Sequence, residues 1–178
     1  LNSLTITDNT ASGGGGGGLH LYNSDNVILE NLTVTGNTAY YGGGADGGGI
    51  YIKVSDNPML ENLTVTDNTS SDKGGGLYIY DSDTPILSNL TVTGNTADIN
   101  GGGLYIYGSD TAILNSLTIT DNTANWGGGI YIRESNNAML ENLTVTGNTA
   151  VESGGGGIRL YNSPNAMLEN LTVTGNTA

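Results

Sequence analysis

Residues 101–124 read GGGLYIYGSDTAILNSLTITDNTA, and close copies of this stretch recur along the whole chain. Each copy contains Thr-Val-Thr or Thr-Ile-Thr, which occurs seven times at intervals of 26 to 31 residues. All of the length variation falls in the segment that leads through the glycine run, and the rest of the copy has a constant length. A constant repeat with one variable loop is typical of a solenoid, in which each turn stacks on the next.

Three segments of residues 101–124 have the pattern of short strands. Residues 104–107 and 117–120 alternate apolar and polar side chains, and residues 112–114 form a short apolar run. The sequence therefore predicts an all-β fold, a right-handed parallel β-helix (β-solenoid) of about six turns of 26–31 residues with three short strands per turn. The right hand follows from the general preference of parallel crossover connections. We expect one solenoid domain over residues 1–178, as a segment of a longer repeat array or filament.

Leucines that should point inward recur at the same two places in every copy. The first predicted column contains Leu1, Leu29, Leu60, Leu87, Leu114, Leu140 and Leu168. The second contains Leu4, Leu32, Leu63, Leu90, Leu117, Leu143 and Leu171. Burying one such side chain contributes about 1.5–3 kcal/mol, so these columns supply the core of a chain that has one Trp and neither Phe nor Cys.

Three polar columns should be architectural. Stacked asparagine amides can hydrogen-bond along the axis and satisfy buried bends, and these asparagines are Asn9, Asn37, Asn68, Asn95, Asn122, Asn148 and Asn176. The residue before each of them is Gly or Asp, which both tolerate positive φ. The other bend carries Ser24, Ser55, Ser82, Ser109, Ser135 and Ser163.

Composition excludes several classes of partner. The chain has 17 acidic and 4 basic residues, for a net charge of −13. Nucleic acid and anionic membrane surfaces both require Lys and Arg, so we expect neither as a partner. No apolar run approaches the length needed to cross a bilayer, which argues against membrane insertion.

Two recurring motifs resemble those of a known class of repeat. They are Gly-Gly-Gly-Ile-Tyr-Ile at 47–52 and 127–132, and Asn-Leu-Thr-Val-Thr-Gly-Asn-Thr-Ala at 31–39, 89–97, 142–150 and 170–178. Both are similar to the right-handed parallel β-helix repeats of microbial surface and secreted proteins, including polymorphic outer-membrane-protein-like passengers and adhesins. This resemblance implies an extracellular or cell-surface location and a structural role.

The outward threonines form the first candidate binding face. Regular Thr-x-Thr arrays resemble the ice-binding face of insect antifreeze solenoids, although threonine is also among the best residues for any exposed strand. The array contains Thr5, Thr7, Thr33, Thr35, Thr64, Thr66, Thr91, Thr93, Thr118, Thr120, Thr144, Thr146, Thr172 and Thr174. An ice surface is therefore the alternative ligand.

The outward residues of the glycine-led strand form a candidate association face. Tyrosines combine an apolar ring with a polar tip, which suits packing and lateral association. Because the residue type varies from turn to turn at these positions, packing and association are favoured over the binding of a repetitive sugar ligand. The tyrosines are Tyr22, Tyr51, Tyr78, Tyr80, Tyr105, Tyr107, Tyr131 and Tyr161.

Catalytic and metal sites have weaker candidates. The sole histidine, His20, occupies a tyrosine position, and no constellation breaks the repeat as an enzyme site would require, so we expect no enzyme and no catalytic residue. Calcium is a possible ligand of the recurring Asp and Glu, but a calcium-binding nonapeptide is missing, and we expect no metal site or cofactor. Asn-Leu-Thr sequons permit N-glycosylation, but an inward corner asparagine would be inaccessible to it.

The ends of the chain are interchangeable in pattern. Residues 1–11 and 168–178 follow the same repeat, and neither has a distinct cap. We therefore expect the coil to continue, within a longer chain or by stacking on itself end to end or laterally. The expected function is a non-enzymatic extracellular structural module, such as a filament, stalk or adhesin passenger segment, with an ice-binding solenoid as the alternative.

Overall fold

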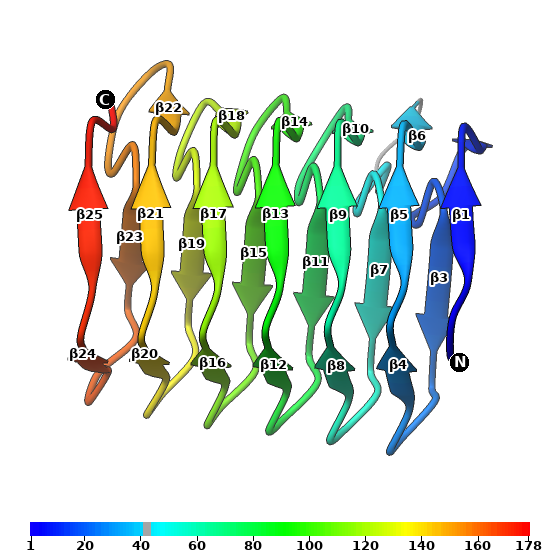
Figure 1. Ribbon diagram of the computed structural model, residues 1–178, viewed down its shortest axis with the longest axis horizontal. Helices are drawn as coiled ribbons and strands as arrows, with labels where there is room; N and C mark the ends of the chain where they lie inside the picture. Colours follow the sequence, from blue (N-terminus) through cyan, green and yellow to red (C-terminus); the bar gives the residue numbers. More distant parts are fainter. Residues whose placement is uncertain (41–43) are drawn as a thin grey trace.

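The computed structural model describes residues 1–40 and 44–178 as a parallel β-helix. Strands of successive turns lie side by side, and the two termini lie at opposite ends of the coil (Figure 1). None of the described residues forms a helix long and apolar enough to cross a membrane. The predicted solenoid is confirmed, and each turn adds a short strand that the sequence did not predict.

Four parallel sheets run the length of the coil. The threonine sheet contains β1 (Thr5–Thr7), β5 (Thr33–Thr35), β9 (Thr64–Thr66), β13 (Thr91–Thr93), β17 (Thr118–Thr120), β21 (Thr144–Thr146) and β25 (Thr172–Thr174). The tyrosine sheet contains β3 (Leu19–Tyr22), β7 (Ile50–Lys53), β11 (Leu77–Tyr80), β15 (Leu104–Tyr107), β19 (Ile130–Arg133) and β23 (Ile158–Tyr161).

The two remaining sheets are built from shorter strands. One contains β4 (Ile28–Glu30), β8 (Met59–Glu61), β12 (Ile86–Ser88), β16 (Ile113–Asn115), β20 (Met139–Glu141) and β24 (Met167–Glu169). The additional sheet contains β2 (Thr10–Ser12), β6 (Thr38–Tyr40), β10 (Thr69–Ser70), β14 (Thr96–Ala97), β18 (Thr123–Ala124) and β22 (Thr149–Ala150). Its strands follow the asparagine bend, in a segment outside the three strands predicted for each turn.

Every strand pairs with the same strand of the neighbouring turn in the predicted register. Leu77 pairs with Leu104, for example, and Ile79 pairs with Ile106. The two leucine columns and the Ile or Val between the threonines point inward and are fully buried in the central turns. This single continuous core holds the turns together, because each inward side chain packs on its own copy above and below.

The asparagine column is a buried hydrogen-bonded ladder, as predicted. Nδ2 of Asn122 donates to Oδ1 of Asn148 and to the carbonyl of Val92, each at 2.9 Å. Oδ1 of Asn122 accepts from the backbone N and from Nδ2 of Asn95, each at 2.9 Å. The serine column works similarly at the opposite bend, where the hydroxyl of Ser109 accepts from the backbone N of Ser82 at 3.0 Å.

The glycine run makes room for this ladder. Gly101 has a φ of +63°, a left-handed backbone conformation, and lies just before the tyrosine strand β15. A Cβ on Gly103 would lie 2.7 Å from the carbonyl oxygen of Gly129, closer than real Cβ contacts, and 3.0 Å from Cγ and Nδ2 of the buried Asn122. The glycines therefore let the loop backbone pack directly against the asparagine amides.

Asp and Gly alternate at the bend before the asparagines for a similar reason. Asp67 and Asp121 have φ values of +55°, and Gly94 between them has a φ of +67°. A Cβ on Gly94 would overlap Oδ1 of Asp67, which lies one turn earlier. Gly36, Gly94 and Gly147 thus each leave space for the carboxylate of the preceding turn. The prediction of a bend with positive φ is confirmed.

The corner asparagines of the Asn-Leu-Thr sequons point outward, so the inward orientation that would make them inaccessible does not occur. Asn31, Asn62, Asn89, Asn142 and Asn170 are exposed, with φ values between +53° and +57°. The left-handed backbone at this corner turns their side chains outward, where the amide of Asn170, for example, donates to Oδ1 of Asn142 at 3.2 Å.

We expect Asn122→Ala to lower the free energy of unfolding by roughly 3 kcal/mol, because it leaves several buried backbone and amide groups without partners. Chemical denaturation followed by circular dichroism measures the change. Asn125→Ala in the same turn is the matched control, because its amide contacts Glu152 at the surface, 3.2 Å away, and its cost should stay within about 0.5 kcal/mol. Equal costs for both variants would show that the ladder is not stabilising.

Candidate functional site

All fourteen predicted threonines lie on the outer side of one sheet. Thr5 pairs with Thr33, and the same register continues through to Thr144 and Thr172. The first threonine of each strand is exposed, and the second is half-buried in the central turns. The array is therefore two parallel files, with rungs about 4.8 Å apart.

Threonine hydroxyls of the second file bond to one another between turns. Oγ1 of Thr66 donates to Oγ1 of Thr35 at 2.9 Å, and the hydroxyls of Thr93 and Thr120 are 2.8 Å apart. These contacts hold the hydroxyl rotamers of neighbouring rungs together. The face is thus a regular and partly pre-ordered lattice of methyl and hydroxyl groups.

The tyrosine sheet differs from the expected association face. The first outward tyrosine of its central strands, Tyr51, Tyr78, Tyr105 or Tyr131, is only 2–5% exposed. The prediction of an exposed face is therefore wrong for these four residues, which we call the inner tyrosine file. Their rings stack at centroid distances of 4.9 to 5.0 Å, and Trp126 of the β18–β19 loop packs against the cluster. Stacking and loop packing together remove the rings from solvent.

The second outward position forms a more open outer file. Tyr22 and Tyr161 are exposed, and the half-buried rings of Tyr80 and Tyr107 stack at 5.4 Å. Lys53 and Arg133 replace tyrosine in two turns. Lys53 Nζ lies 5.3 Å from the centre of the Tyr80 ring, and the Arg133 guanidinium lies 5.4 Å from both Tyr107 and Tyr161. The replacements preserve the stack through cation–π contacts.

Burial changes the acid–base chemistry of the inner file. It raises the pKa of the Tyr51, Tyr78 and Tyr105 phenols well above the usual range. The negative charge of Asp46 adds to the rise at Tyr51 and Tyr78. These phenols remain protonated at any physiological pH.

All four basic residues of this acidic chain border the tyrosine sheet. Lys53, Arg133 and Arg159 lie on its strands, and Lys73 lies in the loop before β11. Lys73 pairs with Asp72 at 2.9 Å and Asp46 at 3.6 Å, and Arg133 pairs with Glu134 at 3.0 Å. The face thus concentrates aromatic and cationic groups in one place.

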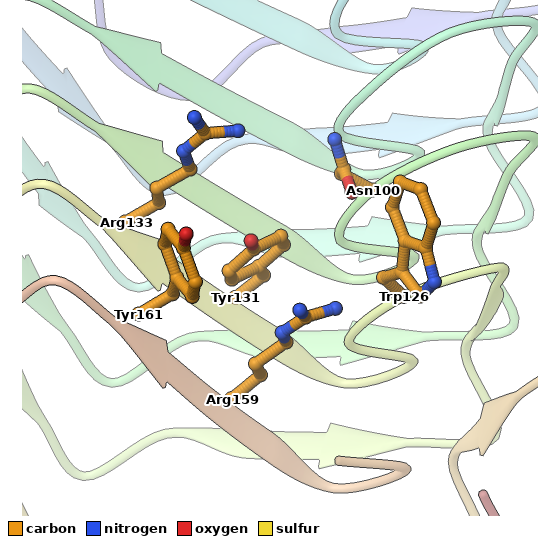
Figure 2. A pocket seen from close by; sticks show the side chains of 6 residues that line it. All are labelled: Asn100, Trp126, Tyr131, Arg133, Arg159 and Tyr161. Atoms are coloured by element: carbon orange, nitrogen blue, oxygen red, sulfur yellow. The ribbon is translucent and has the colours of Figure 1, made fainter. Parts of the chain in front are cut away.

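Two hollows lie side by side on this face and share Arg133. The first, of about 290 Å³, is lined by Lys73, Tyr78, Tyr80, Tyr105, Tyr107 and Arg133. The second, of about 210 Å³, is lined by Asn100, Trp126, Tyr131, Arg133, Arg159 and Tyr161. Figure 2 shows the second hollow, with the Arg159 guanidinium pointing from its strand toward Trp126. We refer to it as the Trp126 hollow.

Asn100, Trp126 and Arg159 were not predicted to form one group. Asn100 and Trp126 each directly precede Gly-Gly-Gly and pair with each other in adjacent turns, and Arg159 replaces a tyrosine of the inner file. The available signals were this shared position before the glycines and the replacement of tyrosine by Arg in an otherwise regular file. The approach of the Trp126 ring to Arg159 depends on side-chain and loop conformations that the repeat pattern does not specify.

The recurring aspartates have a structural partner. Oδ1 of Asp56 accepts from the backbone N of Asp83 at 3.0 Å, and Oδ1 of Asp83 accepts from the backbone N of Asp110 at 2.9 Å. Asp46 of the longest loop is mostly buried, which raises the pKa of its carboxyl, and Lys73 partly offsets the rise. Within residues 1–40 and 44–178, no three His, Asp or Glu side chains gather as a metal site would require.

Comparison with known proteins defines the class. A family model described as "Right handed beta helix region" matches residues 2–117 and, in a second overlapping match, residues 76–178. The chain therefore belongs to the right-handed β-helix family, and the predicted hand is confirmed.

One solved structure matches this chain at low similarity. It is the A-module of the mannuronan C-5 epimerase AlgE4 from Azotobacter vinelandii, which is 15% identical, with a TM-score of 0.43. The match covers 99% of this chain and 57% of that module. No curated protein matches the sequence.

We expect the phenols of Tyr51, Tyr78 and Tyr105 to ionise only when the protein unfolds, because burial raises the pKa of each. In an unfolded chain a tyrosine ionises near pH 10. The unfolded state then binds fewer protons than the native state, so stability falls as the pH rises above about 10. Absorbance at 295 nm, followed together with circular dichroism, shows whether this ionisation coincides with unfolding.

Two variants test this coupling. Tyr78→Phe should reduce the ionisation that coincides with unfolding, whereas Tyr22→Phe, at a position that is 62% exposed, should leave it unchanged. A single transition of all ten tyrosines in folded protein would contradict the burial of the inner file.

Proposed function

We propose that this chain is a non-enzymatic structural module of the cell exterior, a stiff segment of a stalk, filament or adhesin passenger. The unbroken register of the turns is the observation that supports this role most. One buried amide ladder, donating at 2.9 Å from each asparagine to the next, runs from Asn37 to Asn176. A coil held by hydrogen bonds and a continuous core at every turn resists bending and local opening.

We expect copies of this chain to stack on one another in solution. Leu1 is 53% exposed in the first turn and Leu168 is 49% exposed in the last, whereas their counterparts in the central turns are fully buried. A second copy stacked on either turn would bury these residues and pair the open strand edges.

We expect Leu168→Glu to abolish end-to-end association, because it places a charge in the column that the next turn would cover. Sedimentation velocity over a range of concentrations and negative-stain electron microscopy measure rod length. Thr172→Glu is the matched control, with its charge on the outer face of the same turn, and it should leave rod length unchanged. Wild-type protein that remains a single short particle at high concentration would contradict self-stacking.

The threonine array supports a second candidate function, binding to ice. Its specific support is the register of both files over seven strands, with inter-turn hydroxyl contacts at 2.8 and 2.9 Å. A flat lattice of methyl and hydroxyl groups can order water at a regular spacing, which a scattered set of threonines cannot do.

We expect Thr91→Lys to remove thermal hysteresis if this face binds ice, because a long charged side chain lifts the surface away from the crystal. Osmometry and the shape of growing ice crystals provide the measurement. Ser88→Lys adds the same charge on a different sheet and should retain the activity of the parent protein. Absence of hysteresis in the parent would end the ice-binding hypothesis.

A further inference from the structure

The Trp126 hollow contains polar atoms that the protein itself does not satisfy. Oδ1 of Asn100 and Nη1 of Arg159 are both buried and have no hydrogen-bond partner. Asn100 as a whole is only 5% exposed. Leaving such atoms unpaired costs about 1–3 kcal/mol each, so their presence in one hollow requires an explanation.

Arg159 also lacks a balancing charge. Among the residues that the structure describes, no carboxylate oxygen lies within ion-pair distance of its guanidinium, whereas Lys73 and Arg133 both have such a partner. The Arg159 guanidinium instead lies over aromatic rings, 4.8 Å from the centre of Tyr131 and 5.8 Å from that of Trp126. The rings hold the cation in place and leave its hydrogen-bonding capacity unused.

The walls of the hollow are suited to a ring-shaped ligand. Trp126 and Tyr161 present aromatic faces around the unpaired guanidinium (Figure 2). A volume of about 210 Å³ is below the roughly 300–1,000 Å³ of pockets for drug-sized ligands, which limits the occupant to about one ring. The neighbouring hollow continues the groove, so the ring can belong to a longer molecule.

We propose that the Trp126 hollow binds an acidic monosaccharide unit, a hydroxylated ring that carries a carboxylate. Arg159 donates to the carboxylate after a small shift that uncovers Nη1. The carboxylate provides the acceptor and the negative charge that the chain lacks at this point. Oδ1 of Asn100 accepts from a ring hydroxyl after a small adjustment of its side chain. Trp126 packs against the apolar face of the ring, which a free inorganic anion does not have.

The binding site does not depend on the proposed structural role. A structural module that carries this site would in addition bind a specific ligand. The residues that carry it are departures from the repeat, because the positions equivalent to Arg159 hold Tyr131, Tyr105, Tyr78 and Tyr51 in earlier turns. Binding at one turn does not disturb the ladders that hold the coil together.

The experiment uses the fluorescence of Trp126, which is the sole tryptophan of the chain and therefore reports directly on the hollow. Glucuronate, N-acetylneuraminate and glucose are titrated into the wild-type protein. We expect saturable binding of at least one of the two acidic sugars. The difference in affinity between glucuronate and N-acetylneuraminate identifies which acidic sugar the hollow prefers. Binding of neither acid, or equal binding of glucose, would overturn the proposal.

Charge-matched variants test the role of the guanidinium. Arg159→Gln should weaken binding of the acidic sugar by about tenfold or more, because a charged hydrogen bond is lost. Lys53→Gln removes the same charge from the same sheet, distant from the hollow, and should change the affinity by less than about twofold. Equal losses of affinity in the two variants would show that only the net charge of the protein matters, and would overturn the proposed site.

A conservative variant covers the case in which Arg159→Gln unfolds the last turn, which circular dichroism would reveal. Arg159→Lys retains the positive charge and the stacking over Tyr131 but loses the planar pair of donors. We expect several-fold weaker binding of the acidic sugar with an unchanged melting temperature. Wild-type affinity in this variant would overturn the assignment of the guanidinium as the carboxylate donor.

Discussion

Parallel pairing of each strand with its own copy is the constraint on which the rest of the structure depends. In-register stacking places every side chain about 4.8 Å from a similar one above and below. A column is stable only if its residue type tolerates that neighbour. Leucines pack on leucines, asparagine amides donate to asparagine amides, and tyrosine rings stack on tyrosine rings. The turns are therefore held together by the same repetition that defines the sequence.

Carboxylates tolerate such stacking poorly, and the structure manages them in two ways. Asp25, Asp56 and Asp83 each direct Oδ1 to the backbone N of the next turn, where a donor replaces a like charge. At the other bend Asp67 lies below Gly94, which has no side chain to oppose it. The acidic composition is thus compatible with a tightly stacked coil.

Much of the candidate site followed from alternation alone, because the side chains of a strand point alternately to its two faces. This rule placed Thr91 and Thr93 together on the outer surface and Leu90 in the core, as the structure shows. It failed at Tyr78, which points outward from the coil and is nevertheless buried. Alternation describes one strand, whereas burial of Tyr78 also depends on the stacked rings above and below it and on the loops that fold against them.

The sequence by itself determined the solenoid, its register and the inward and outward sides of three strands, because these follow from a repeat period and from local alternation. Only the tertiary structure decided which outward residues are covered and which lie in a hollow. It also showed the fourth sheet, whose strands of two or three residues, such as Thr123–Ala124, are too short to carry a pattern. Asn100 and Trp126 hold the same position of the repeat and pair between adjacent turns, but the approach of the Trp126 ring to Arg159 depends on side-chain and loop conformations, which leave no periodic signal.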